Sequence, residues 1–201
     1  MKSYVINLKR RKDRLEHITK ECKRVGLEMV LIEAVDGKIR HKDVQGKILK
    51  NALGCYDSHL IALRLIRDSG EGGLILEDDN IFIDNLWERF SLCVAELPSN
   101  WKMFFLGGSL LNENAIEDYS DNLKRAKSVL CTNAYMVHKD AVVELIEHLE
   151  KEAFKIDVLY TRYQSDNECF IAYPELAWQI KGHSDLVDCI TDNTHLRYGR
   201  S

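Results

Sequence analysis

The stretch LILEDDN, residues 74–80, places three acidic residues directly after three large aliphatic residues. An apolar run of this length that follows EGG and precedes charged residues predicts a short buried β-strand. Three adjacent carboxylates repel one another, so the end of this strand is either a solvated turn or a place where a positive group is held. The strands and helices predicted on either side help to decide between a solvated turn and a binding site.

Apolar periodicity predicts the other elements of the chain. Five further apolar runs predict strands over residues 4–8, 29–35, 103–108, 129–137 and 169–174. Apolar residues at helical spacing predict helices over residues 13–25, 54–70, 84–97 and 139–151.

The first helix carries signals at both ends. Asp13, with Glu16 three residues later, predicts a capping box at its start, and Gly26 predicts its end. Two polar stretches, 38–53 and 109–127, show no periodicity; the first is left unassigned and the second is predicted to be a loop.

Strands that alternate with helices predict an α/β fold, with a mostly parallel central sheet flanked by helices on both faces. We find no repeat, low-complexity tract or linker, so residues 1–201 are expected to form a single domain. Ligands of such sheets bind at the carboxyl ends of the strands. The position of Glu77, Asp78 and Asp79 at a strand end therefore favours a binding site over a solvated turn.

Composition excludes several classes of protein. A net charge of −4 and a pI near 6.0 argue against a nucleic-acid partner. Six cysteines are scattered singly, which is typical of reduced, mostly buried thiols in a cytoplasmic protein rather than of a disulfide framework or a zinc site. No apolar segment is long enough to span a bilayer. Peripheral contact with a membrane surface stays open, because it needs only a modest basic or aromatic patch.

The acidic triplet suits a divalent cation. Side chains alternate along an extended chain, so Glu77 and Asp79 are expected to point one way and Asp78 the other. Such an acid-x-acid pair can hold Mn²⁺ or Mg²⁺, and the cation can neutralise a diphosphate leaving group. Taken alone, the triplet is equally compatible with a solvated turn.

Other polar residues near predicted strand ends or helix faces have ordinary structural explanations as well. Asn7 ends the first strand and leads into a basic loop suited to nucleotide phosphates, although Arg11 there is also compatible with a solvated helix entry. His59 lies on the apolar side of its helix, where a hydrogen-bonded core histidine is the ordinary role. Ser58 beside it is also compatible with a hydroxyl that bonds its own backbone.

Several blocks of sequence follow one another in a fixed order along the chain: YVINLKRRKDRLEHI, EAVDG, GCYDSHLIALRLI, LILEDDN, FFLGG, CTNAYMVHKDAVVELIEHL, IDVLY and YPELAWQIKGHSDL. In their order and spacing they resemble glycosyltransferase family 25, the family of lipooligosaccharide and procollagen galactosyltransferases. The resemblance implies a GT-A-like fold, a nucleotide-sugar donor such as UDP-galactose or UDP-glucose, and Mn²⁺ or Mg²⁺ as cofactor.

The resemblance also implies roles for individual residues. Asp79 would bind the metal directly, and Glu77 would lie nearer the donor ribose or a water of the metal shell. Asn7 and Arg11 would contact the donor, and Asp78 would either contact it or hold the loop by accepting backbone hydrogen bonds. Ser58 and His59 are assigned to the same donor site.

Three later acidic or basic residues complete the expected site. Asp157 is the candidate base that deprotonates the acceptor hydroxyl in an inverting transfer, and a helix N-cap is its alternative role. His183 and Asp185 are candidates for further metal or phosphate ligands, and a polar surface loop is their alternative.

The function expected from the sequence is a metal-dependent inverting glycosyltransferase that moves galactose or glucose from a UDP-sugar to a hydroxyl of a glycan or protein. A degenerate, non-catalytic member that binds nucleotide sugars or glycans is the alternative. A metal-dependent nuclease or phosphohydrolase would need a basic track that the scattered lysines do not provide. The sequence does not indicate the oligomeric state.

Overall fold

One eight-stranded sheet runs through the computed structural model, which describes residues 2–110 and 112–192. Its strands are, in spatial order, β2 (Glu28–Glu33), β1 (Lys2–Asn7), β3 (Gly73–Glu77), β10 (Ala134–Val137), β5 (Met103–Phe105), β11 (Cys169–Ala172), β8 (Leu123–Ala126) and β7 (Ile116–Asp118). Six of these strands run in one direction, and β10 and β8 oppose them. The expected α/β fold with a mostly parallel sheet is confirmed.

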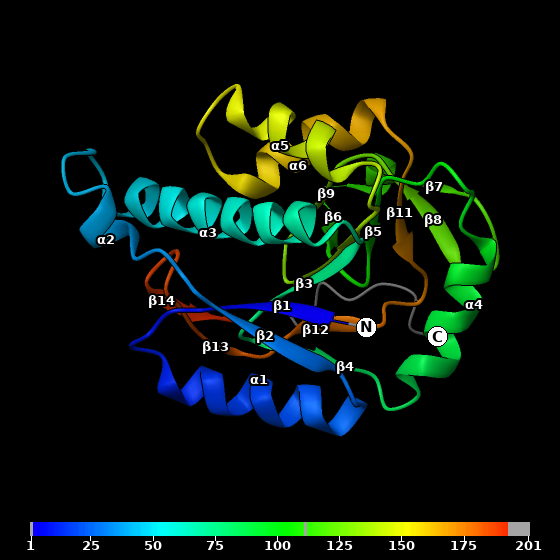
Figure 1. Cartoon of the computed structure of the whole chain (residues 1–201), viewed down its shortest axis with the longest axis horizontal. Helices are drawn as coiled ribbons and strands as arrows, with labels where there is room; N and C mark the ends of the chain where they lie inside the picture. The colour runs from blue at the N-terminus through cyan, green and yellow to red at the C-terminus, as the bar shows by residue number, and fades with distance from the viewer. Residues whose placement is uncertain (1, 111, 193–201) are drawn as a thin grey trace.

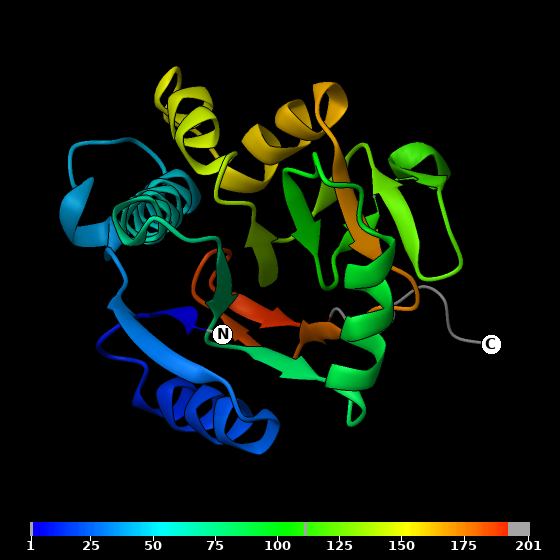
Figure 2. The same ribbon diagram turned by 45° about the vertical axis from the view of Figure 1, so that its right-hand side comes forward.

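Five longer helices cover the two faces of the sheet (Figures 1 and 2). They are α3 (Lys47–Ser69), α5 (Val142–Glu150) and α6 (Ile156–Asp166) on one face, and α1 (Lys12–Val25) and α4 (Leu86–Glu96) on the other. On β3, Ile75 packs into the core under α3, whereas Leu74 and Leu76 pack into the core under α1 and α4. Burial on both faces explains why three successive residues of this strand, 74–76, are large and aliphatic.

Shorter elements surround the sheet. They are α2 (Gly37–Arg40), η1 (Glu113–Ala115), β4 (Asn80–Phe82), β6 (Ser109–Leu110), β9 (Val129–Leu130), β12 (Ala177–Gln179), β13 (Gly182–Ser184) and β14 (Cys189–Thr191). The short strands pair antiparallel as β4 with β12, β6 with β9, and β13 with β14. Within residues 2–110 and 112–192, no helix combines the length and the apolar character that a membrane span requires.

The predicted capping box at the start of α1 is wrong. The helix begins one residue earlier than expected, at Lys12, and the residue before it, Arg11, makes no side-chain cap bond. Asp13 lies inside the first turn, where its carboxylate accepts hydrogen bonds from the Arg11 guanidinium at 3.0 and 2.8 Å. The predicted end is confirmed, because Gly26 adopts a left-handed conformation with φ of 71°.

The prediction of a loop over residues 109–127 is also wrong. This stretch contains β7 and β8, which extend the sheet beyond β11. Strand β8 has the polar sequence LKRA, and its central residues are held by ion pairs: Lys124 with Asp118, and Arg125 with Glu168. Pairing with β11 and these ion pairs define the strand, so apolar periodicity does not reveal it.

Two further boundaries differ from prediction. The strand expected over residues 129–137 divides into β9 and β10, because Cys131 has a φ of 71° and breaks the extended chain. The helix expected over residues 54–70 begins at Lys47 instead. The unassigned stretch 38–53 therefore holds α2, a turn and the start of α3.

Close backbone contact joins α2 to α3. A Cβ atom on Gly54 would lie 2.6 Å from both the Gly37 nitrogen and the Val35 oxygen, so only glycine allows this approach. Ser58 reinforces the contact, because its hydroxyl accepts a hydrogen bond from the Val35 N–H at 2.9 Å. The packing fixes the chain that follows β2 against the middle of α3.

Candidate active site

The acidic triplet lies where the carboxyl ends of two parallel strands meet. Ile6 of β1 pairs with Glu77 of β3, so Asn7 and Asp78 are neighbours across the sheet. A cavity of about 350 Å³ opens at this edge. Seven of the residues predicted for the site line it: Ser58, His59, Glu77, Asp78, Asp79, Asp157 and Asp185.

Asp78 points towards β1 and is buried. Its carboxylate accepts hydrogen bonds from the Asn7 amide at 2.7 Å and from the Arg14 guanidinium at 3.0 Å. Asn7 does not line the cavity and instead bridges Asp78 to the Arg11 carbonyl oxygen, 3.1 Å away. Burial raises the pKa of Asp78, and the contact with Arg14 opposes that shift.

Glu77 and Asp79 converge on one point. The Gln179 amide nitrogen lies 3.5 Å from Glu77 Oε2 and 3.4 Å from Asp79 Oδ1. The other oxygen of Glu77 accepts a hydrogen bond from the Thr132 hydroxyl at 2.6 Å. Burial favours the neutral form of Glu77, but His59 and Thr132 outweigh it and lower the pKa of this carboxyl.

The surroundings of Asp79 disfavour the ionised form of its carboxyl group. Burial, followed by repulsion from Glu77, raises the pKa of Asp79 to about 7, although the Arg14 charge acts in the opposite direction. A positive group placed between Glu77 and Asp79 would relieve both causes. The electrostatics therefore suit a cation at the point where these two carboxylates converge.

Arg14 is a site residue that sequence reasoning missed. Its guanidinium contacts Asp78 and Asp79 through one nitrogen, at 3.0 and 2.7 Å, and the His183 carbonyl oxygen through another, at 2.7 Å. Burial disfavours this charge, but Asp79 and Asp78 outweigh burial and raise the pKa of Arg14. One signal was available: Arg14 follows the basic loop of Arg10 and Arg11 and lies in the first turn of the helix after β1.

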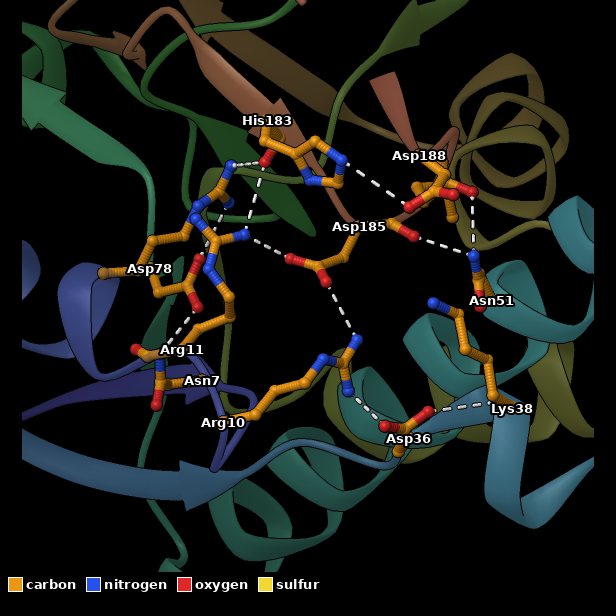
Figure 3. Close-up of polar contacts among 12 residues, drawn as sticks. Asn7, Arg10, Arg11, Asp36, Lys38, Asn51, Asp78, His183, Asp185 and Asp188 are labelled. Carbon is orange, nitrogen blue, oxygen red and sulfur yellow. Dashed lines mark hydrogen bonds and ion pairs between the residues drawn. The ribbon is translucent and has the colours of Figure 1, made fainter. Parts of the chain in front are cut away.

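A second cluster of charges links the start of the chain to the β13–β14 hairpin (Figure 3). Asp185 lies between the guanidinium groups of Arg10, 2.8 Å away, and Arg11. Arg10 also contacts Asp36, and the Asn51 amide donates to the backbone oxygen of Asp185 at 2.7 Å. Opposite charges from distant segments thus hold the hairpin over the cavity.

The other predicted ligands are placed differently. The Asp185 carboxylate faces Arg10 and Arg11, and His183 Nε2 faces Asp188 at 3.5 Å. His183 turns only its backbone oxygen towards Arg14. Neither side chain therefore joins Glu77 and Asp79 in this structure.

Asp157 faces the cavity from the first turn of α6. The N-cap of this helix is Lys155, and Asp157 accepts a hydrogen bond from the Val158 N–H at 2.8 Å. Burial raises the pKa of Asp157, and the charge of Glu77 adds to the shift. A carboxylate with a raised pKa is a stronger base, which suits proton abstraction at the cavity wall.

Replacing Asp79 by asparagine should stabilise the metal-free protein above neutral pH. The Asp79 pKa rises from 3.8 to about 7 on folding, so its contribution to stability is full below about pH 4 and is lost as the pH rises through about 7. Asparagine cannot ionise, so Asp79→Asn should raise the free energy of unfolding at about pH 8 by on the order of 2 kcal/mol. Denaturant unfolding with a chelator present, repeated across this pH range, measures the change. Parallel profiles for the two proteins would contradict the prediction.

Comparison with protein families gives one match over most of the chain. The model described as "Glycosyltransferase family 25 (LPS biosynthesis protein)" matches residues 1–160. A curated relative, the "Procollagen lysyl hydroxylase and glycosyltransferase" of Acanthamoeba polyphaga mimivirus, is 31% identical over 163 residues. The match covers 68% of this chain and 18% of that protein, so the chain spans less than a fifth of the relative's length.

Two solved structures are similar over nearly the whole chain. A glycosyltransferase involved in the glycosylation of the major capsid of PBCV-1 has a TM-score of 0.52 and 13% identity, and 97% of each chain is covered. A197 from STIV has a TM-score of 0.51 and 9% identity, with 94% of this chain and 91% of that chain covered. At these identities the likeness concerns the fold, and it confirms the expected GT-A-like architecture.

Proposed function

Because the chain belongs to glycosyltransferase family 25, we propose that it transfers a sugar from a nucleotide-sugar donor to a hydroxyl group of a glycan or protein acceptor. One observation carries the proposal: Glu77, Asp78 and Asp79 line a cavity at the carboxyl ends of parallel strands, and Arg14 lies beside them. A site for a nucleotide diphosphate requires carboxylates that bind the cation and guanidinium groups that bind the phosphates.

The donor that we propose is a UDP-hexose, either UDP-galactose or UDP-glucose, bound together with Mn²⁺ or Mg²⁺. The residues present fit such a cation, because Glu77 Oε2 and Asp79 Oδ1 converge within 3.5 Å of the same amide nitrogen of Gln179. Carboxylate oxygens are the ligands that hard divalent cations prefer. When bound, the cation would supply neutralising charge to the leaving diphosphate.

The chain's own residues would hold the donor and move the acceptor proton. Arg10 and Arg14 line the cavity and offer donors for phosphate oxygens. Arg10 now contacts Asp185, so a diphosphate would compete with that carboxylate for it. In an inverting transfer, the Asp157 carboxylate would accept the proton of the acceptor hydroxyl as its oxygen attacks the anomeric carbon.

Thermal unfolding with defined ligands tests this function. The purified protein should melt at a higher temperature with UDP-galactose or UDP-glucose plus Mn²⁺, because a ligand of the folded state alone stabilises it by about 2.7 kcal/mol at a hundredfold excess over Kd. The Asp79→Asn variant should show a cooperative melting transition, which demonstrates that it is folded, but no manganese-dependent rise in melting temperature. An absence of any shift in the folded wild-type protein with UDP, UDP-galactose or UDP-glucose would overturn the UDP-sugar proposal.

A further inference from the structure

Cys55, His59 and Glu77 form a cluster beside the acidic triplet. Cys55 and His59 lie one turn apart on the same side of α3, and Glu77 ends β3. Cys55 Sγ, one ring nitrogen of His59 and a carboxylate oxygen of Glu77 all lie within 4.8 Å of one another. All three residues line the cavity, and Cys55 and Glu77 are partly exposed, whereas His59 is buried.

Among residues 2–110 and 112–192, one ring nitrogen of His59 finds no hydrogen-bond partner, although the residue is fully buried. Nδ1 lies 2.8 Å from the Tyr135 hydroxyl, which lies 2.7 Å from the Tyr160 hydroxyl. Nε2 lies 3.4 Å from Glu77 Oε1 but lacks the geometry of a hydrogen bond. A buried polar atom left in this way is uncommon and requires an explanation.

The hydroxyl chain bears on the tautomer of His59. If Tyr135 donates its proton to Tyr160, it accepts the Nδ1–H of His59, and Nε2 is left with a lone pair. In that tautomer the lone pair lies 3.4 Å from Glu77 Oε1, and a cation between the two atoms would stabilise this arrangement. In most metal-binding histidines, one ring nitrogen binds the metal and the other is held by a hydrogen bond, as Nδ1 of His59 is held here.

The distance between His59 and Glu77 suits a tetrahedral metal ion. With bonds of about 2.0 Å to nitrogen and oxygen, tetrahedral angles place the two ligand atoms roughly 3.3 Å apart. His59 Nε2 and Glu77 Oε1 already lie 3.4 Å apart, and Cys55 supplies a sulfur ligand. A mixed sulfur, nitrogen and oxygen ligand set favours Zn²⁺ over Mg²⁺ or Mn²⁺.

We propose that Cys55, His59 and Glu77 bind one Zn²⁺ ion, with a fourth coordination position open to the cavity. The thiol of Cys55 gives up its proton to solvent as the sulfur–zinc bond forms. Glu77 faces His59 through Oε1 and the Gln179 amide through Oε2, so this ion and the hard cation of the donor site would use different oxygens of one carboxylate. The inference rests on these contacts alone and does not require the proposed transferase activity.

Titration of the reduced, metal-free protein with Co²⁺ tests the site. One equivalent should produce the visible bands of tetrahedral cobalt and a thiolate-to-cobalt charge-transfer band, and Zn²⁺ should displace both. Cys55→Ser should abolish the charge-transfer band. Cys131→Ser is the matched control, because Cys131 lines the same cavity outside the cluster, and it should leave the band unchanged. Tyr135→Phe should weaken binding about tenfold or more, because it frees the orientation of His59.

Two results would overturn the zinc site. One is the absence of a thiolate–cobalt band in the wild-type protein, and the other is a band that survives Cys55→Ser. Failure here is distinguishable from failure of the proposed function: Asp79→Asn should keep the cobalt band and lose the manganese-dependent shift with UDP-sugar. Cys55→Ser should lose the cobalt band and keep the manganese-dependent shift with UDP-sugar.

Discussion

Replacing Asp157 by asparagine should slow sugar transfer by about 10²–10⁴-fold, which is the contribution expected of a general base. Asparagine keeps the side-chain oxygen that accepts the Val158 N–H, so the first turn of α6 is retained. The amide cannot take up a proton, so loss of rate should occur with little change in donor affinity. Product formation under saturating donor and acceptor, together with donor binding by thermal shift, measures the two effects separately.

A matched control lies on the same helix. Asp166 ends α6, is exposed and lies outside the cavity wall, so Asp166→Asn should leave the rate of transfer within about twofold of wild type. A loss confined to donor affinity in Asp157→Asn, with the rate at saturation unchanged, would exclude the role of base.

Replacing Arg14 by methionine should destabilise the protein by about 3–5 kcal/mol, because it leaves buried carboxylates without their counter-charge. The Arg14 side chain is 11% exposed and those of Asp78 and Asp79 are 10% exposed, so solvent compensates little of the loss. Methionine preserves most of the apolar contact of the arginine stem, which isolates the effect of the charge. Denaturant unfolding at neutral pH, with a chelator present, gives the free energy.

Two comparisons make the Arg14 prediction specific. Lys20 is an exposed cation on the same helix, and Lys20→Met should change the free energy of unfolding by about 0.5 kcal/mol or less. Adding Asp79→Asn to Arg14→Met should recover part of the stability, because one uncompensated charge is removed. Equal losses in Arg14→Met and Lys20→Met would show that the guanidinium does not neutralise the triplet.

The strand that ends in acids was predictable from sequence because two independent rules agree there. A fully apolar run signals a strand buried on both faces, and the carboxyl ends of parallel strands are where α/β sheets bind ligands. Leu74 and Leu76 pack on one face and Ile75 on the other, as that rule requires. The register of β1 against β3 then places Asn7 beside Asp78.

Arg14 and β8 were not predictable by the same means. The rotation of α1, which carries Arg14 to Asp78 and Asp79, is set by the packing of Ile18 and Cys22 against the sheet. Helical periodicity identifies the apolar face of the helix but does not indicate which polar residue beside that face reaches a neighbouring strand. Strand β8 is polar at its centre and depends on its neighbour β11, so it lacks a local signal.

The attachment of the last strands to the acidic triplet has a consequence for the order of folding. Gln179 reaches Asp79 across 100 residues of chain, and the contact between Arg11 and Asp185 spans 174. Contacts of such separation form late, because the intervening loop must be closed before they contribute. During synthesis the acidic strand therefore leaves the ribosome long before its last partners do. A nascent chain thus cannot assemble the complete ligand cavity until β12 and the β13–β14 hairpin have emerged.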